Sequence, residues 1–215
     1  ISSSQWLDSP NFVGSFEHKE HVYIFFREVA QRGRSIQSRV ARVCKSDVGY
    51  YPVLTGSWTS FAKARLNCSL PGNYPYYFDE IQAIHSFRGT GAGAELFVSA
   101  VFKTNENAIL ASALCVFAME DIEETFRGKF ADESEFGIVK PVAEDTVPSK
   151  PRPGTCMQYS SKLGPKHTKF IKSHPLMFDA VDAVFKRPVF QRGGVDLQSV
   201  STDSVQTNDC RPVFV

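Results

Sequence analysis

Short stretches in which apolar and polar residues alternate fill the first half of the chain. They are rich in Val, Ile, Phe and Tyr, and turn-forming residues such as Gly89–Gly93 separate them. This pattern is typical of antiparallel β-strands joined by hairpins. We expect strands at Phe12–Phe16, Val22–Glu28, Gln37–Cys44, Trp58–Asn67, Ile81–Phe87, Glu95–Lys103 and Ala108–Phe117. The predicted fold class is all-β.

The strand pattern also repeats weakly. Val22–Phe26 aligns with Leu96–Ala100, and Val40–Val43 aligns with Leu114–Phe117, both at an offset of 74 residues. A repeat of this length that holds four strands is consistent with one blade of a β-propeller with long loops. At this period the 215 residues hold about three blades, which is fewer than a closed propeller needs. We therefore expect part of a propeller.

The pattern changes in the second half. Met119–Phe126 predicts a short amphipathic helix, Pro141–Pro165 is a proline-rich loop, and Lys166–Met177 and Phe178–Phe185 predict two short helices interrupted at Pro175. We expect about two blades in residues 1–135, a proline-rich loop and helical excursion in 136–187, and the start of the next strands, truncated, in 188–215. Long excursions on a rigid scaffold commonly carry binding.

Composition excludes several classes of protein. A chain with 42% hydrophobic residues is too apolar to be a disordered tail, and a net charge of +1 lacks the basic footprint of a general nucleic-acid binder. The longest apolar runs, Val22–Phe26 and Leu96–Phe102, are far shorter than the roughly 20 residues of a membrane helix. We expect no nucleic-acid partner and no membrane insertion by this segment. Both ends of the sequence predict a piece of a longer protein.

The cysteines leave two interpretations open. The chain contains Cys44, Cys68, Cys115, Cys156 and Cys210. Their spacing is not that of a zinc site, so we expect no metal. Four of them could form two disulfides in an oxidising compartment, or they could be buried free thiols. The sequon Asn67-Cys68-Ser69 favours the secretory route and makes Asn67 a candidate glycosylation site.

The sequence contains little evidence of a catalytic site. No G-x-S-x-G or HExxH motif is present, and the histidines are not paired at helical spacing. The glycine-rich stretch Arg88–Ala94 lacks the features of a phosphate loop and predicts a hairpin. The carboxylate pairs Asp79-Glu80 and Glu120-Asp121 keep a propeller-type hydrolase of the sialidase or glycosidase kind open as an alternative. We expect that the chain is not an enzyme and has no catalytic residue and no cofactor.

Six pieces of the sequence together resemble the sema domain of semaphorins. They are Trp6–Val13, Val22–Glu28, Ser38–Gly49, Trp58–Ser69, Pro151–Cys156 and Phe170–Met177, and they occur in family order over nearly the whole chain. The resemblance implies the middle of a seven-bladed propeller. It also implies an extracellular ligand, secreted or carried by a membrane-anchored parent, that binds plexin receptors, guides cell or axon migration and forms a homodimer when complete.

The resemblance also implies roles for individual residues. Cys44 should pair with Cys156 and Cys68 with Cys115, while Cys210 has no assigned partner. Lys172 and His174 in the excursion are candidates for receptor contact, with Arg27 and Glu28 as further candidates. Phe170, Ile171, Leu176 and Met177 are expected to form the packing face of the excursion.

Overall fold

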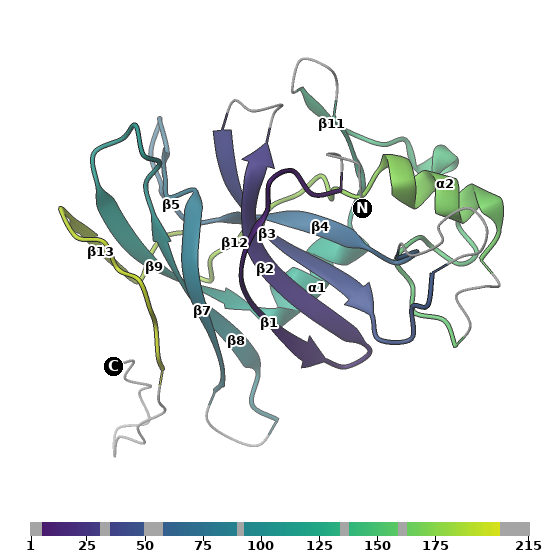
Figure 1. The fold of residues 1–215 in the computed structure, drawn as a ribbon, viewed down its shortest axis with the longest axis horizontal. Coiled ribbons are helices and arrows are strands. Elements are labelled where there is room, and N and C mark those ends of the chain that lie inside the picture. Colours follow the sequence, from purple (N-terminus) through teal and green to yellow (C-terminus); the bar gives the residue numbers. More distant parts are fainter. Residues whose placement is uncertain are drawn as a thin grey trace. The chain divides into compact units, whose positions relative to one another are not determined.

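The computed structural model describes residues 6–30, 35–49, 58–89, 93–133, 138–158 and 163–202 (Figure 1). The chain divides into two compact units. The first unit contains Ile1–Arg65 and Thr125–Ala180, and the second contains Leu66–Glu124 and Val181–Val215. Cys210 and the centre of the glycine-rich stretch, residues 90–92, lie outside the described residues.

The first unit is built on an antiparallel sheet with the strand order β1-β2-β3-β4. Its strands are β1 (Asn11–His18), β2 (His21–Ala30), β3 (Ser35–Cys44) and β4 (Ala62–Asn67). The aromatic and branched residues predicted from the alternating pattern are buried here, among them Tyr23, Phe25, Phe26, Val40 and Phe61. Burial of these large side chains is the main stabilising contribution.

The second unit repeats this design with the strand order β7-β8-β9-β13. Its strands are β7 (Glu80–Arg88), β8 (Leu96–Lys103), β9 (Ala111–Ala118) and β13 (Phe190–Gly193). A ribbon of β5 (Ser69–Leu70) and β6 (Tyr76–Tyr77) lies in the same unit, and β12 (Val181–Asp182) pairs in parallel with Leu66 and Asn67 at the end of β4. Each predicted strand is therefore present, although the one expected from Trp58 begins only at Ala62.

The chain has two helices within the described residues, α1 (Met119–Arg127) and α2 (Pro165–Ser173). α1 and β10 (Ala131–Glu133) precede the excursion. The excursion itself contains α2, the strand β11 (Val139–Pro141), which pairs with β10, and a 3₁₀ turn, η1 (Glu144–Thr146). α2 begins with a proline, whose missing N–H is not needed in the first turn, and ends before Pro175, which disfavours helix in the residue before it.

The prediction of a second helix in the excursion, at Phe178–Phe185, is wrong. The buried residue Val181 instead pairs with Leu66 as part of β12, so tertiary pairing overrides the local helical pattern.

The repeat is present but its spacing differs between strands. Phe25 on β2 and Ser99 on β8 are 74 residues apart, whereas their cross-strand partners Val40 and Val116 are 76 apart. The loop between β8 and β9 absorbs the two additional residues, and because two is the period of a strand, each side chain keeps its face of the sheet. The excursion takes up part of the length of chain that the period would assign to a third blade.

Candidate functional site

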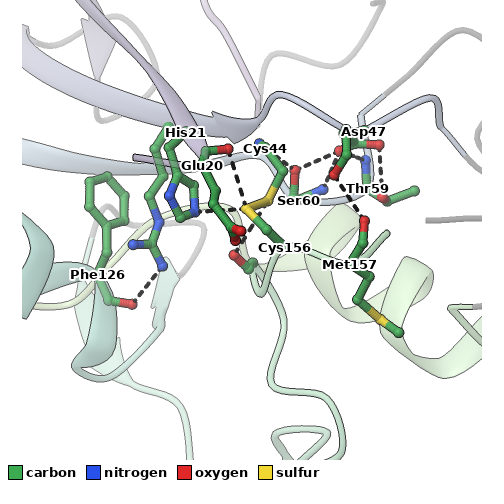
Figure 2. Close-up of a disulfide and its surroundings, with 12 residues drawn as sticks. Glu20, His21, Cys44, Asp47, Thr59, Ser60, Phe126, Cys156 and Met157 are labelled. Carbon is green, nitrogen blue, oxygen red and sulfur yellow. Dashed lines mark hydrogen bonds between the residues drawn. A yellow bond between two sulfur atoms is a disulfide. The ribbon is translucent and has the colours of Figure 1, made fainter. Parts of the chain in front are cut away.

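A disulfide between Cys44 and Cys156 joins the end of β3 to the proline-rich segment, 112 residues further along the chain (Figure 2). The Cys156 Sγ atom also lies 3.2 Å from Nε2 of His21. Gly154, two residues before Cys156, has φ of +83°, a conformation that L side chains rarely adopt. The sequence Pro-Gly-Thr-Cys therefore turns the segment so that Cys156 faces the sheet.

The carboxylate of Asp47 organises the turn that follows β3. It accepts hydrogen bonds from the backbone N–H groups of Thr59 and Ser60, each at 2.8 Å, and from their hydroxyls at 2.9 and 2.6 Å (Figure 2). Ser60 Oγ in turn accepts a 2.9 Å hydrogen bond from the backbone N–H of Cys44. The network positions Cys44, and charge-assisted bonds of this kind are among the stronger ones in proteins.

Two arginines pack against aromatic rings of the segment that leads into the excursion. The guanidinium carbon of Arg42 lies 4.6 Å from the centre of the Phe126 ring, and Arg42 Nη2 donates to the Phe126 carbonyl at 3.4 Å. The guanidinium of Arg152 lies 5.0 Å from the centre of the Phe130 ring and donates to the Gly128 carbonyl. These cation–π contacts add to the covalent attachment made by the disulfide.

The expected packing face of the excursion is buried. Ile171 and Met177 are almost fully buried, and the Phe170 ring packs edge-on against Phe130 with centroids 5.1 Å apart. After α2 the chain runs beside β4, where the Lys63 N–H donates to the Pro175 carbonyl at 2.7 Å and the Met177 N–H donates to the Lys63 carbonyl at 2.8 Å. The first sheet thus gains a further extended segment.

The two receptor-contact candidates of the excursion lie at the end of α2. Lys172 is exposed, and His174 is half-buried with its ring stacked on Phe170 at 4.7 Å between centroids. His174 Nδ1 lies 3.3 Å from the Phe170 carbonyl, which fixes the ring orientation. The side chain of Lys172 is therefore available to a partner, whereas His174 is held against the helix.

Sequence reasoning missed the part played by Trp6. Its ring is buried, stacks on Phe61 at 5.3 Å between centroids, and donates from Nε1 to the Lys172 carbonyl at 3.2 Å. A tryptophan near the N-terminus thereby holds the last turn of α2. The signal available in the sequence was that a large aromatic residue seldom remains exposed when a core is near.

The other two receptor-contact candidates differ in their exposure. Arg27 is half-buried on β2, whereas Glu28 is 2% exposed. Glu28 Oε1 accepts from Lys63 Nζ at 2.6 Å and from Arg39 Nε at 3.1 Å, and its Oε2 accepts from the Asp8 N–H at 3.3 Å. A carboxylate occupied in this way by buried partners cannot reach a receptor, so the candidacy of Glu28 is corrected to a structural role.

Burial affects the two cations of this network. Desolvation lowers the pKa of Lys63 and of Arg39 below the ordinary values, and the attraction of Glu28 opposes this effect without cancelling it. Neither the buried carboxylate nor the buried cations follow from strand alternation, which would place charged residues toward water.

The candidate glycosylation site lies at the end of β4. Asn67 is half-buried, and its Nδ2 donates to Asp182 Oδ1 at 2.7 Å. The next residue, Cys68, is bonded to Cys115 across 47 residues, and both cysteines are 1% exposed or less. Both disulfide pairings implied by the resemblance are thus present in the structure.

The carboxylates considered for catalysis do not form a paired site. Glu80 is buried with Oε2 3.7 Å from Lys103 Nζ, which is a structural ion pair, and Glu120, Asp121 and Glu124 lie on the exposed face of α1. Among the described residues, the cluster with metal-ligand spacing is His21, Cys44 and Cys156, whose sulfur atoms are already joined in the disulfide. Within the same residues no helix is long and apolar enough to cross a membrane.

The sequence matches the family model described as Sema domain over residues 81–214. It is 43% identical to Semaphorin-2A of Schistocerca gregaria over 95% of this chain and 29% of that protein, and 45% identical to human Semaphorin-6C over 86% of this chain and 21% of that protein. The chain thus spans less than a third of the length of these curated relatives.

Solved structures give the same result. Drosophila Semaphorin 1b, extracellular domains 1-2, superposes with a TM-score of 0.89 at 40% identity over 99% of this chain and 42% of that one. The complex described as Drosophila Plexin A in complex with Semaphorin 1b gives 0.88 at 41% identity over 98% of this chain and 42% of that one. The expected fold class, part of a propeller with a short helical excursion, is confirmed by these matches.

Proposed function

The chain belongs to the semaphorin family, and on this premise we propose that it is the central part of a sema domain, binds a plexin receptor and thereby guides cell or axon migration. The supporting observation is the similarity over 98% of the chain to a structure of Plexin A in complex with Semaphorin 1b. Semaphorins are signalling ligands and not enzymes, so the hydrolase alternative is not carried further.

We assign the receptor contact to the end of α2, with Lys172 as its main residue. The Lys172 side chain is exposed on a helix that the Cys44–Cys156 disulfide and Trp6 hold in place. A charge presented on a rigid element accelerates encounter with an oppositely charged surface and selects its orientation. His174 contributes by position, and Arg27 is a further candidate on β2.

The same family membership supports an extracellular compartment. Similar structures are extracellular domains of semaphorins, and two long-range disulfides persist only in an oxidising environment. We propose that the parent protein is either secreted or membrane-anchored with this segment outside the cell, that Asn67 carries a glycan, and that the complete protein is a homodimer.

Titration of a plexin ectodomain against the protein recovered from the medium of secreting cells tests the proposal. We expect saturable binding that the unlabelled plexin ectodomain competes away. Lack of saturable binding by material that is folded and correctly disulfide-bonded would remove the assignment of a plexin ligand. Sedimentation of the same material tests the homodimer separately.

A further inference from the structure

An open cleft of about 1320 Å³ lies between the proline-rich segment and α2 in the first unit. One wall consists of residues 140–143 and 145–151, and the other wall consists of the face of α2 that carries Lys166, Lys169 and Ser173. These three residues recur at helical spacing and so point to one side of the helix. Lys172, the main residue of the proposed receptor contact, lies outside this lining, whereas His174 is part of it.

The cleft has an excess of positive charge. Lys140, Lys150, Lys166 and Lys169 line it and are exposed, against the two carboxylates of Asp132 and Asp145. Within the part of the chain that the structure describes, none of the four lysines makes an ion pair. Other lysines of the chain do, since Lys63, Lys103 and Lys45 contact Glu28, Glu80 and Glu17. Cations left uncompensated around a concave surface focus the field on an anionic ligand.

We propose that this cleft binds a sulfated polysaccharide chain. Lysine ammonium groups are compact point charges on flexible stems, which can adapt to sulfate groups spaced along a polymer. The volume of the cleft exceeds the roughly 300–1,000 Å³ of small-molecule pockets, which favours an extended ligand. The hydroxyls of Thr146, Ser149 and Ser173 in the same lining supply hydrogen-bonding partners for sugar hydroxyls.

The lining argues against a nucleic acid. Single strands gain much of their affinity from bases stacked on aromatic faces. The Phe170 ring, which lines the cleft, is instead packed between Phe130 and the stacked ring of His174 and is 8% exposed. The inference goes beyond the proposed plexin binding, because it concerns a second ligand, bound by Lys166 and Lys169 and not by Lys172.

The test is the affinity of the secreted protein for immobilised heparin as a function of salt concentration. We expect the double variant Lys166→Glu/Lys169→Glu to bind heparin at least about tenfold more weakly near physiological salt, with a shallower salt dependence, because fewer counterions are released. A matched control is Lys186→Glu/Arg187→Glu, an equal charge change at two exposed residues of the second unit. Its affinity should stay within about twofold of the parent.

Several results would overturn the proposal. An equal loss in both double variants would show that net charge alone attracts heparin, and equal binding of desulfated heparin would show that sulfate is not recognised. Poly-glutamate that competes as well as heparin would indicate an acidic protein ligand instead. If the α2 variant does not fold, Lys140→Glu/Lys150→Glu on the opposite wall must weaken heparin binding in its place. Plexin titration of the same proteins separates this outcome from failure of the proposed function.

Discussion

The two sheets of the chain have the same strand order but differ in their core side chains and in what their disulfides join. Each has three long antiparallel strands in sequence order, and each unit contains one long-range disulfide. In the first unit that disulfide fastens the excursion, whereas in the second it lies within the core, where Cys68 and Cys115 are 1% exposed or less. The shared strand order is a scaffold, and the first unit differs from the second by carrying the segment to which we assign the receptor contact.

Two equivalent positions show the difference most clearly. At the spacing set by strand pairing, Glu28 on β2 corresponds to Phe102 on β8, and Arg39 on β3 corresponds to Cys115 on β9. Phe102 and Cys115 are fully buried and apolar, while Glu28 and Arg39 form a buried ion pair 3.1 Å apart. At these two positions the second sheet therefore has apolar packing, whereas the first has a buried ion pair, which contributes little net stability compared with apolar packing.

Removing the two disulfides should have the largest effect. For closed loops of 112 and 47 residues, the chain-entropy relation gives upper limits of about 5 and about 4 kcal/mol. We expect Cys44→Ser/Cys156→Ser and Cys68→Ser/Cys115→Ser both to lower the denaturant midpoint of the secreted protein sharply, the first also exposing the proline-rich segment to limited proteolysis. Cleavage of that segment at the parent's rate in the first variant would contradict its role as a tether.

Breaking the ion pair should rank next. Glu28→Gln leaves Lys63 and Arg39 buried without their carboxylate, which typically costs about 3–5 kcal/mol. The exposed pair of Glu17 and Lys45 provides the control, because Glu17→Gln should change stability by less than about 1 kcal/mol. Urea denaturation of both variants measures the difference. Equal changes in the free energy of unfolding would show that the buried ion pair matters no more to stability than the exposed one.

The same variant should respond to pH. Without Glu28 the pKa of Lys63 falls further below its ordinary value of 10.5, since desolvation is then less opposed. Between the folded pKa and 10.5 the unfolded state binds more protons, so stability rises with pH in that window. The deficit of Glu28→Gln relative to the parent should therefore narrow as the pH rises through the folded-state pKa of Lys63 in the variant. A deficit that widens would contradict the proposed cause.

Loss of Asp47 should have a smaller effect, confined to the first unit. Asp47→Ala leaves the N–H groups of Thr59 and Ser60 without their acceptor, which we expect to cost about 2–3 kcal/mol. Asp179→Ala, at an exposed position, is the matched control and should be near neutral. Thermal denaturation of the two variants compares them directly, and an Asp47→Ala midpoint equal to that of Asp179→Ala would contradict the role of the turn.

Removing the proposed glycosylation site should have the smallest effect on stability. Asn67→Gln should remove one glycan mass from the secreted protein while changing stability by less than about 1 kcal/mol, because the Asn67–Asp182 hydrogen bond is exposed. Intact-mass measurement before and after enzymatic deglycosylation gives the answer. An unchanged mass in the variant would remove Asn67 as a glycosylation site.

Much of the scaffold could be predicted from the sequence. Alternation located the long strands to within a few residues, because one face of each sheet is buried and fixes the register. The helix expected over Phe178–Phe185 failed because Val181 finds a partner in β4, a contact between residues 115 positions apart that no local pattern records.

The site was predicted less completely. The position of α2 and the exposure of Lys172 agree with the sequence interpretation, but Glu28 was placed on a surface because strand alternation does not reveal a charged residue whose partners come from β3 and β4. The hydrogen bond from Trp6 to the Lys172 carbonyl also depends on tertiary structure. So does the cleft, because its lysines come from segments that are far apart in the chain.

The central claim is that receptor recognition lies at the end of α2, in the first unit, and that the second unit is scaffold. The affinity and association rate of plexin for Lys172→Glu, compared with those for Lys186→Glu in the second unit, test it most directly. We predict that Lys172→Glu lowers affinity by about three- to tenfold, mainly through slower association at low salt, and that Lys186→Glu has no effect. Equal affinities for the two variants, or a loss only in Lys186→Glu, would contradict the account.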